Sequence, residues 1–238
     1  MTIASGYARP ARADSIFFPA IALAMALVVF AGFAPSYYLK SVFNAPPPIS
    51  PLMAMHGAAF TGWIALLVAQ TGLVAANRRD MHRALGAAGV ALAAAMVVLG
   101  LMLAHDALVR GFTPPGGPPP AVFFIVPVGG ILAFLVLVGL GTANRKRADA
   151  HKRYMLLATA LLVEPAAARL PVVRELPPPV FFGIADLFIV AMIAYDFSQR
   201  GRIQRATWIC AAVIVASQVL RLVIGFTPAW QAFANSLI

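Results

Sequence analysis

Seven long apolar runs constrain the fold of this chain more than any other feature of its sequence. A membrane-spanning helix needs roughly 20 mostly apolar residues, because the hydrocarbon core of a bilayer is about 30 Å thick. Backbone groups inside lipid must be hydrogen-bonded within the protein, and runs of this length meet that requirement as helices. The chain is 61% hydrophobic and 11% charged, which is too apolar for a soluble domain of 238 residues. The seven predicted spans of this all-α membrane bundle are Ile16–Leu39, Leu52–Ala76, Ala84–Ala104, Val122–Ala143, Tyr154–Val173, Val180–Phe197 and Trp208–Phe226.

The positions of the basic residues predict how the chain is oriented. The formal net charge is +10, and 13 of the 18 Lys and Arg residues fall in the amino-terminal tail and the second-to-third, fourth-to-fifth and sixth-to-seventh connections. These segments share one side of a seven-span arrangement, and basic residues are enriched on the cytoplasmic side of a membrane. We therefore expect a single integral-membrane domain, 1–238, with a cytoplasmic tail (1–15) and an external carboxyl-terminal segment (227–238). Orientation accounts for the basic excess without nucleic-acid binding, and the expected location is a bacterial inner membrane.

Two basic stretches carry the same signature and indicate an internal repeat. Residues 77–83 and 144–152 each close an apolar run and then place Asp-x-His-basic where the next run begins. Spans two–three and four–five are therefore predicted to be equivalent hairpins, parallel repeats related about the membrane normal. Asp80 and Asp149 are expected to be the N-caps of the helices that follow, because a carboxylate accepts hydrogen bonds from orphan amide groups.

The repeat places two histidines, His82 and His151, at equivalent depth near the cytoplasmic boundary. Capping and charge do not require a histidine in either copy, so both are candidate ligands of a metal ion or a haem iron. Gly86 and Gly89 follow His82 on the same helix face and leave a groove for a neighbouring helix or a flat macrocycle. The alternative is a pair of interfacial histidines that contact lipid phosphate or loop carbonyls.

Polar residues within the predicted spans, mostly in their outer halves, form a second group of candidates. A charged group at the centre of the bilayer costs about 2.5–3.5 kcal/mol on translocon scales, so such groups pair with one another or line a wet cavity. One interpretation is a polar pocket that holds a quinone head, a lipophilic substrate or a proton path. The other is a set of ion pairs that lock helices together. The group comprises His56, Trp63, Glu164, Arg169, Asp186 and Arg221.

The motifs of the two hairpins resemble those of a bacterial multi-pass family that is filed as a domain of unknown function. The family pattern is a helix-borne His, an HRxLG motif after a basic loop, and a later HRRxM motif that runs to an Arg-Leu. This resemblance covers spans two to five and implies kinship without assigning a reaction. A looser similarity is to b-type membrane cytochromes, in which histidines on neighbouring helices hold haem. The matching residues are His56, residues 79–86, residues 151–155, Arg169 and Leu170.

The leading hypothesis is an inner-membrane protein with a redox role. His82 and His151 would supply the axial ligands of one haem b, and the outer pocket would bind a quinone or small lipophilic ligand. One alternative is a non-catalytic assembly factor that delivers haem or copper to a membrane oxidase, and another is a small-solute transporter. The sequence contains no nucleotide-binding loop, catalytic serine elbow, HExxH motif or diiron histidine cluster, so it leaves open whether the protein is an enzyme.

Overall fold

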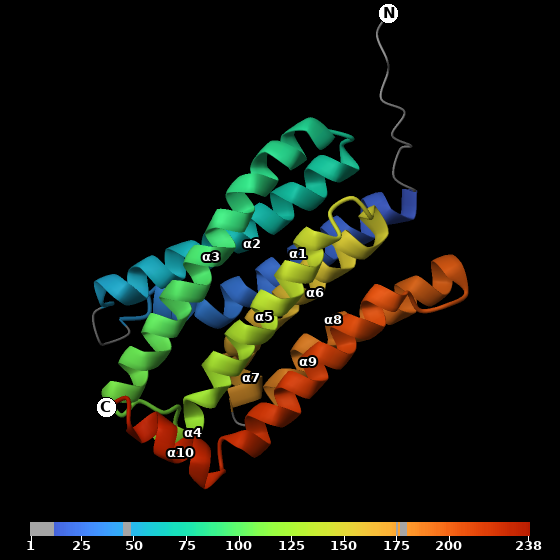
Figure 1. Cartoon of the computed structure of the whole chain (residues 1–238). Coiled ribbons are helices and arrows are strands. Elements are labelled where there is room, and N and C mark those ends of the chain that lie inside the picture. Colours follow the sequence, from blue (N-terminus) through green and yellow to red (C-terminus); the bar gives the residue numbers. More distant parts are fainter. Residues whose placement is uncertain (1–11, 45–48, 175, 177–179) are drawn as a thin grey trace, which may run out of the picture.

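The described part of the chain folds into a bundle of helices. A computed structural model describes residues 12–44, 49–174, 176 and 180–238, and the regular elements within these ranges are all helical. The long helices run along a common direction (Figure 1). In chain order the elements are α1 (Arg12–Phe33), η1 (Ala34–Tyr38), α2 (Pro51–Ala75), α3 (Arg79–Val109), α4 (Pro120–Phe123), α5 (Ile125–Ala143), α6 (Ala148–Ala167), α7 (Pro171–Arg174), α8 (Val180–Arg200), α9 (Arg205–Ile224) and α10 (Pro228–Asn235).

Within the described residues, six helical stretches are long and apolar enough to cross a membrane, in agreement with a multi-pass membrane protein. These stretches contain α1 with η1, α2, α3, α4 with α5, α8 and α9. Their outward faces are rich in exposed Leu, Val and Phe, which suits a lipid environment.

Helix α6 differs from these six because it carries more charge and lies inside the bundle. Thirteen of its 20 residues are buried, and it packs against α1, α5, α8 and α9. Figure 1 shows α6 in the middle of the bundle, between α1 and α8. Its charged residues therefore meet other helices in place of lipid, which is the arrangement expected of polar groups at membrane depth.

Several helix boundaries differ from those predicted from the sequence. The third predicted span, Ala84–Ala104, is extended at both ends, since α3 begins at Arg79 and ends at Val109. The fifth, Tyr154–Val173, is shifted, since α6 begins at Ala148 and ends at Ala167. Pro171 then opens the separate turn α7. A proline disfavours helical geometry in the residue before it, so the helix ends ahead of Pro171.

Among the described helices, α2 packs extensively on α3 and α5 on α6. His82 and His151 each occupy the fourth position of the second helix in their hairpin. The prediction that Asp80 and Asp149 are N-caps was wrong, because the cap residues are arginines without a side-chain cap bond. Both aspartates lie in the first helical turn, where a negative charge is favourable beside the helix dipole.

The end of α1 changes from an α-helical to a π-helical turn. In η1 the amide of Leu39 donates to the carbonyl of Ala34, five residues earlier, at 2.7 Å. The turn directs two tyrosines at α2, where Tyr37 donates to the carbonyl of Ala54 and Tyr38 hydrogen-bonds to Thr61. This turn therefore joins the end of α1 to the start of α2.

The opposite ends of the bundle differ in charge. Figure 1 shows the start of α1 and the turns α2–α3, α5–α6 and α8–α9 at one end, where the basic connections of the sequence gather. We call this the basic end. The short helix α10 lies at the other end, where the Trp230 indole donates to the carbonyl of Ala121 and stacks on Phe124.

Candidate histidine site and polar networks

The structure brings His82 and His151 together at the basic end. Their ring centroids lie 6.2 Å apart and the ring planes are inclined at 83°. A metal ion bound at about 2.0 Å by one nitrogen of each ring would place the centroids roughly 6 Å apart. The two rings therefore lie at a separation that one metal centre can bridge.

His151 is oriented by a hydrogen bond that leaves its other nitrogen available. Its Nδ1 lies 2.8 Å from the carbonyl oxygen of Gly141 in α5. A carbonyl can only accept, so Nδ1 carries the proton and a neutral ring keeps its lone pair on Nε2. A histidine whose second nitrogen is tied to a carbonyl is the usual arrangement of a metal ligand.

The environment of His82 contains two buried polar atoms without partners. Within the described chain, neither Nδ1 of His82 nor Oε1 of Gln70 has a hydrogen-bond partner. Gln70 reaches this site from α2, where its amide lies 3.8 Å from the position that a Cβ on Gly86 would occupy. Buried polar atoms are nearly always satisfied, so two lone pairs left open beside a histidine pair fit a bound cation or water.

The glycine stripe beside His82 is occupied by α2. A Cβ on Gly89 would lie only 2.9 Å from Leu66 Cδ2, and Gly86 faces Gln70. Of the two occupants that the sequence allowed for this groove, the neighbouring helix is the one present. The ring separation suits haem iron, but along this stripe the macrocycle does not fit without displacement of α2.

Three of the outer candidates form a single closed network. Arg221 of α9 donates to both carboxylate oxygens of Glu164 in α6, at 2.7 and 3.0 Å. Gln218 bridges Glu164 to Asp186 of α8, at 3.2 and 2.9 Å. Gly129 makes room for the arginine, since a Cβ there would lie 2.6 Å from Arg221 Cγ. The Arg221–Glu164 pair is neutral and does not require a ligand, while Asp186 meets the neutral amide of Gln218.

The remaining outer candidates lie in different contacts. Trp63 donates from its indole to Thr159 of α6 at 3.0 Å, inside the core. His56 stacks on Phe60 with centroids 4.1 Å apart, and its Nδ1 is a third buried atom without a partner among the described residues. Arg169 lies over the ring of Phe33 and donates to a backbone carbonyl of its own helix turn. No hydrogen bond or ion pair in the described ranges links these three residues to the Glu164 network.

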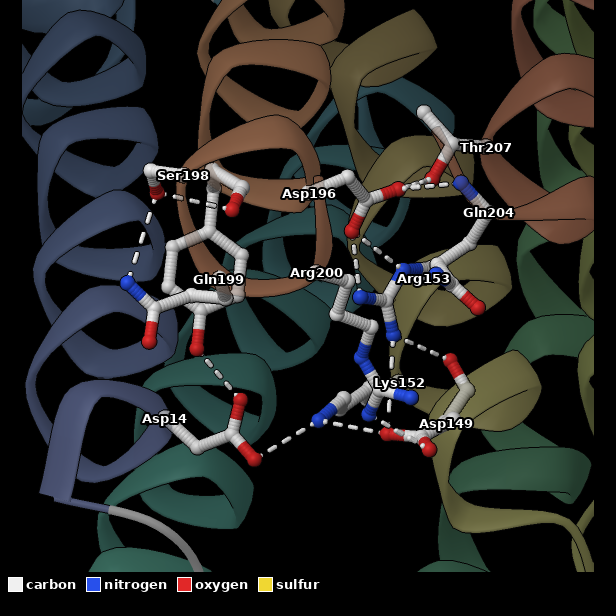
Figure 2. A network of polar contacts seen from close by, with 11 residues as sticks. Asp14, Asp149, Lys152, Arg153, Asp196, Ser198, Gln199, Arg200, Gln204 and Thr207 are labelled. Atoms are coloured by element: carbon white, nitrogen blue, oxygen red, sulfur yellow. Dashed lines mark hydrogen bonds and ion pairs between the residues drawn. The ribbon is translucent and has the colours of Figure 1, made fainter. Parts of the chain in front are cut away.

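A second polar network, which sequence reasoning did not identify, lies at the basic end (Figure 2). Its buried half centres on Arg153 of α6 and Asp196 of α8, which are 1% and 0% exposed. The guanidinium of Arg153 donates to Asp196 twice and to the carbonyl of Asp149. The other carboxylate oxygen of Asp196 accepts hydrogen bonds from the Thr207 hydroxyl at 2.5 Å and from the backbone N–H of Gln204 at 3.0 Å.

The exposed half of this network adds the start of α1. Lys152 bridges Asp14 and Asp149, with N···O distances of 2.8 and 3.0 Å. Arg200 pairs with Asp149 at 2.7 Å, and the Tyr195 hydroxyl donates to Asp14 at 2.5 Å. We call the whole set the inner clamp, because it joins four helices at one end of the bundle. Its charged members are Asp14, Asp149, Lys152, Arg153, Asp196 and Arg200.

From the sequence, the basic residues of the inner clamp were explained only by the orientation of the chain in the membrane. A sequence signal was present, since Asp196 is an acidic residue at the end of an apolar span and Arg200 follows one turn later. Its partner Arg153 is 43 residues away in the sequence, so the pairing depends on the packing of α6 against α8.

Comparison with protein-family models, with curated proteins and with solved structures finds no match to this chain.

Proposed function

We propose that this is a multi-pass membrane protein that binds one metal ion between His82 and His151 and has a redox or metal-delivery role. The ring separation of 6.2 Å is the observation that carries the proposal. The oriented His151 ring and the open lone pairs at His82 and Gln70 support it.

Copper is the metal that this set of side chains suits best. Imidazole nitrogens bind copper, and among divalent first-row metals copper is bound most tightly by such sites. Bound copper would supply one-electron chemistry or a transferable ion, and the protein would hold it at the basic end of the bundle.

A b-type haem is the second candidate, because the same ring separation suits bis-histidine iron. It requires α2 to move away from the Gly86 and Gly89 stripe, which Leu66 and Gln70 now fill. Because of this required movement, haem is a weaker candidate than a single metal ion.

The membrane arrangement proposed for this function has seven spans, with α6 added to the six apolar helical stretches. The basic end then faces the cytoplasm of a bacterium and α10 the outside. The α2–α3 and α5–α6 hairpins would be repeats of one unit, each contributing one histidine.

The test is the metal content and visible spectrum of the full chain, purified in detergent after growth with copper. We expect one copper ion per chain in the wild-type protein and its loss in His82→Ala and in His151→Ala. His105→Ala is the matched control, since His105 binds the carbonyl of Leu237 at the opposite end of the bundle and should leave the copper in place.

The alternatives give different results in the same samples. A Soret band that both site variants abolish would replace copper with haem. A protein without colour or metal would overturn the metal-binding proposal and favour a transporter. Elution as a single symmetric peak shows that each variant is folded.

A further inference from the structure

The turn between α8 and α9 forms a cavity at the basic end, separate from the histidine pair. Its volume is about 430 Å³. The cavity combines basic, amide and apolar side chains. The lining residues are Arg202, Ile203, Gln204, Arg205, Trp208 and Ile209.

The positive charge of this cavity is not neutralised within the protein. The inner clamp beside it pairs three acidic with three basic residues, so its charges balance. Arg202 and Arg205 are exposed, and in the described ranges neither makes a hydrogen bond or ion pair. Two guanidinium groups are therefore left to bind an anion.

Beside the two arginines the lining is apolar and suits the acyl part of an amphiphile. Trp208 is 57% exposed and, with Ile209, offers an apolar wall at the start of α9, and tryptophan is a residue enriched at membrane interfaces.

We propose that this cavity binds the phosphate headgroup of an anionic phospholipid in the leaflet at the basic end. Arg202 and Arg205 would contact the phosphate, and Trp208 with Ile209 would pack on the glycerol and upper acyl chain. A free phosphate could use the arginines but would leave the apolar wall uncovered, so the observations favour a lipid. Basic residues at a membrane surface attract anionic lipids in this way.

The experiment measures lipid retained by the full chain in detergent, using native mass spectrometry with phosphatidylglycerol and phosphatidylcholine. We expect the wild-type protein to retain phosphatidylglycerol in preference to phosphatidylcholine. The double variant Arg202→Gln/Arg205→Gln should bind phosphatidylglycerol roughly thirtyfold more weakly, given the typical contribution of each basic residue.

The matched control, Arg145→Gln/Arg147→Gln, removes the same charge from the α5–α6 turn at the same end. It should keep the preference for phosphatidylglycerol. Equal losses in the two double variants would overturn the proposal, because they would indicate attraction by net charge alone.

A third variant separates lipid from free phosphate. Trp208→Ala should weaken phosphatidylglycerol binding while inorganic phosphate, added as a competitor, displaces little lipid from the wild-type protein. Full displacement by inorganic phosphate, with no effect of Trp208→Ala, would overturn the lipid assignment and leave an anion site.

Discussion

Arg153 and Asp196 form an ion pair in which both side chains are withdrawn from solvent, and three further donors or acceptors complete it. The desolvation of such a pair is costly, so the pair adds little net stability by itself. Loss of one partner is different, because the other charge is then buried without compensation. The inner clamp is thus a point where a single substitution affects several helices.

At this scale we expect Asp196→Ala to destabilise the protein by about 3–5 kcal/mol, the range for breaking a buried ion pair. Thermal unfolding in detergent, followed by the loss of the monodisperse elution peak, measures the effect. Asp106→Ala is the control, because Asp106 pairs with Arg110 at an exposed position and should cost about 0–1 kcal/mol. Equal melting temperatures for the two variants would show that breaking the buried pair costs no more stability than breaking the exposed one.

Individual residues were predictable to different degrees. The sequence placed His82 and His151 at matching positions through their shared motif, and the structure brings their rings together. It grouped Glu164 with Arg169 and Arg221 as candidates, and only the packing of α6 against α9 pairs Glu164 with Arg221. Interactions between residues that are distant in sequence depend on how helices cross, which a local pattern does not specify.

Among the helices, α1 and α6 cross closely at Gly32. A Cβ at this position would overlap the backbone carbonyl of Ala166. The obstacle is backbone, so a change of rotamer cannot relieve it. Small residues permit such close crossings in membrane bundles.

We expect Gly32→Ala to push α1 away from α6 and to destabilise the protein by about 1–3 kcal/mol or more. Gly139→Ala is the matched substitution, because a Cβ there meets nothing within 4 Å. It should be neutral or stabilise α5 by about 0.5–1 kcal/mol. Melting curves of the two variants in the same detergent give the comparison, and a lower melting temperature for Gly139→Ala would contradict this view of the crossing.

The elements themselves follow closely from the apolar runs, with errors at their ends. An apolar run marks the part of a helix that needs shielding from water, while the helix continues through charged residues such as those that open α3 and α6. The cap prediction failed for a related reason, since Asp80 and Asp149 lie inside the first turn. The interior position of α6 could be anticipated only from its charge, which is too high for a helix surrounded by lipid.

For the whole molecule, the number of crossings decides on which side the carboxyl terminus lies. Seven spans place it opposite the basic end, and six would place it on the same side. We expect alkaline phosphatase fused after Ile238, or after Gly116, to be active outside the cytoplasm. A fluorescent protein fused after Lys146 should fluoresce inside it. An inactive phosphatase at Ile238, with an active one at Gly116, would remove α6 from the set of spans.

The π-helical turn at residues 34–38 has a consequence for how this protein can vary in length. Such a turn holds one residue more than the α-helical path between the same two points. Loss of a residue here could be absorbed by reversion to ordinary helical winding, which would leave the preceding register of α1 intact. Tyr37 and Tyr38 lie within the turn, so rewinding it would move both side chains and disturb their hydrogen bonds to α2. The loss of one residue is therefore tolerable at this turn, but it would cost the hydrogen bonds between the turn and α2.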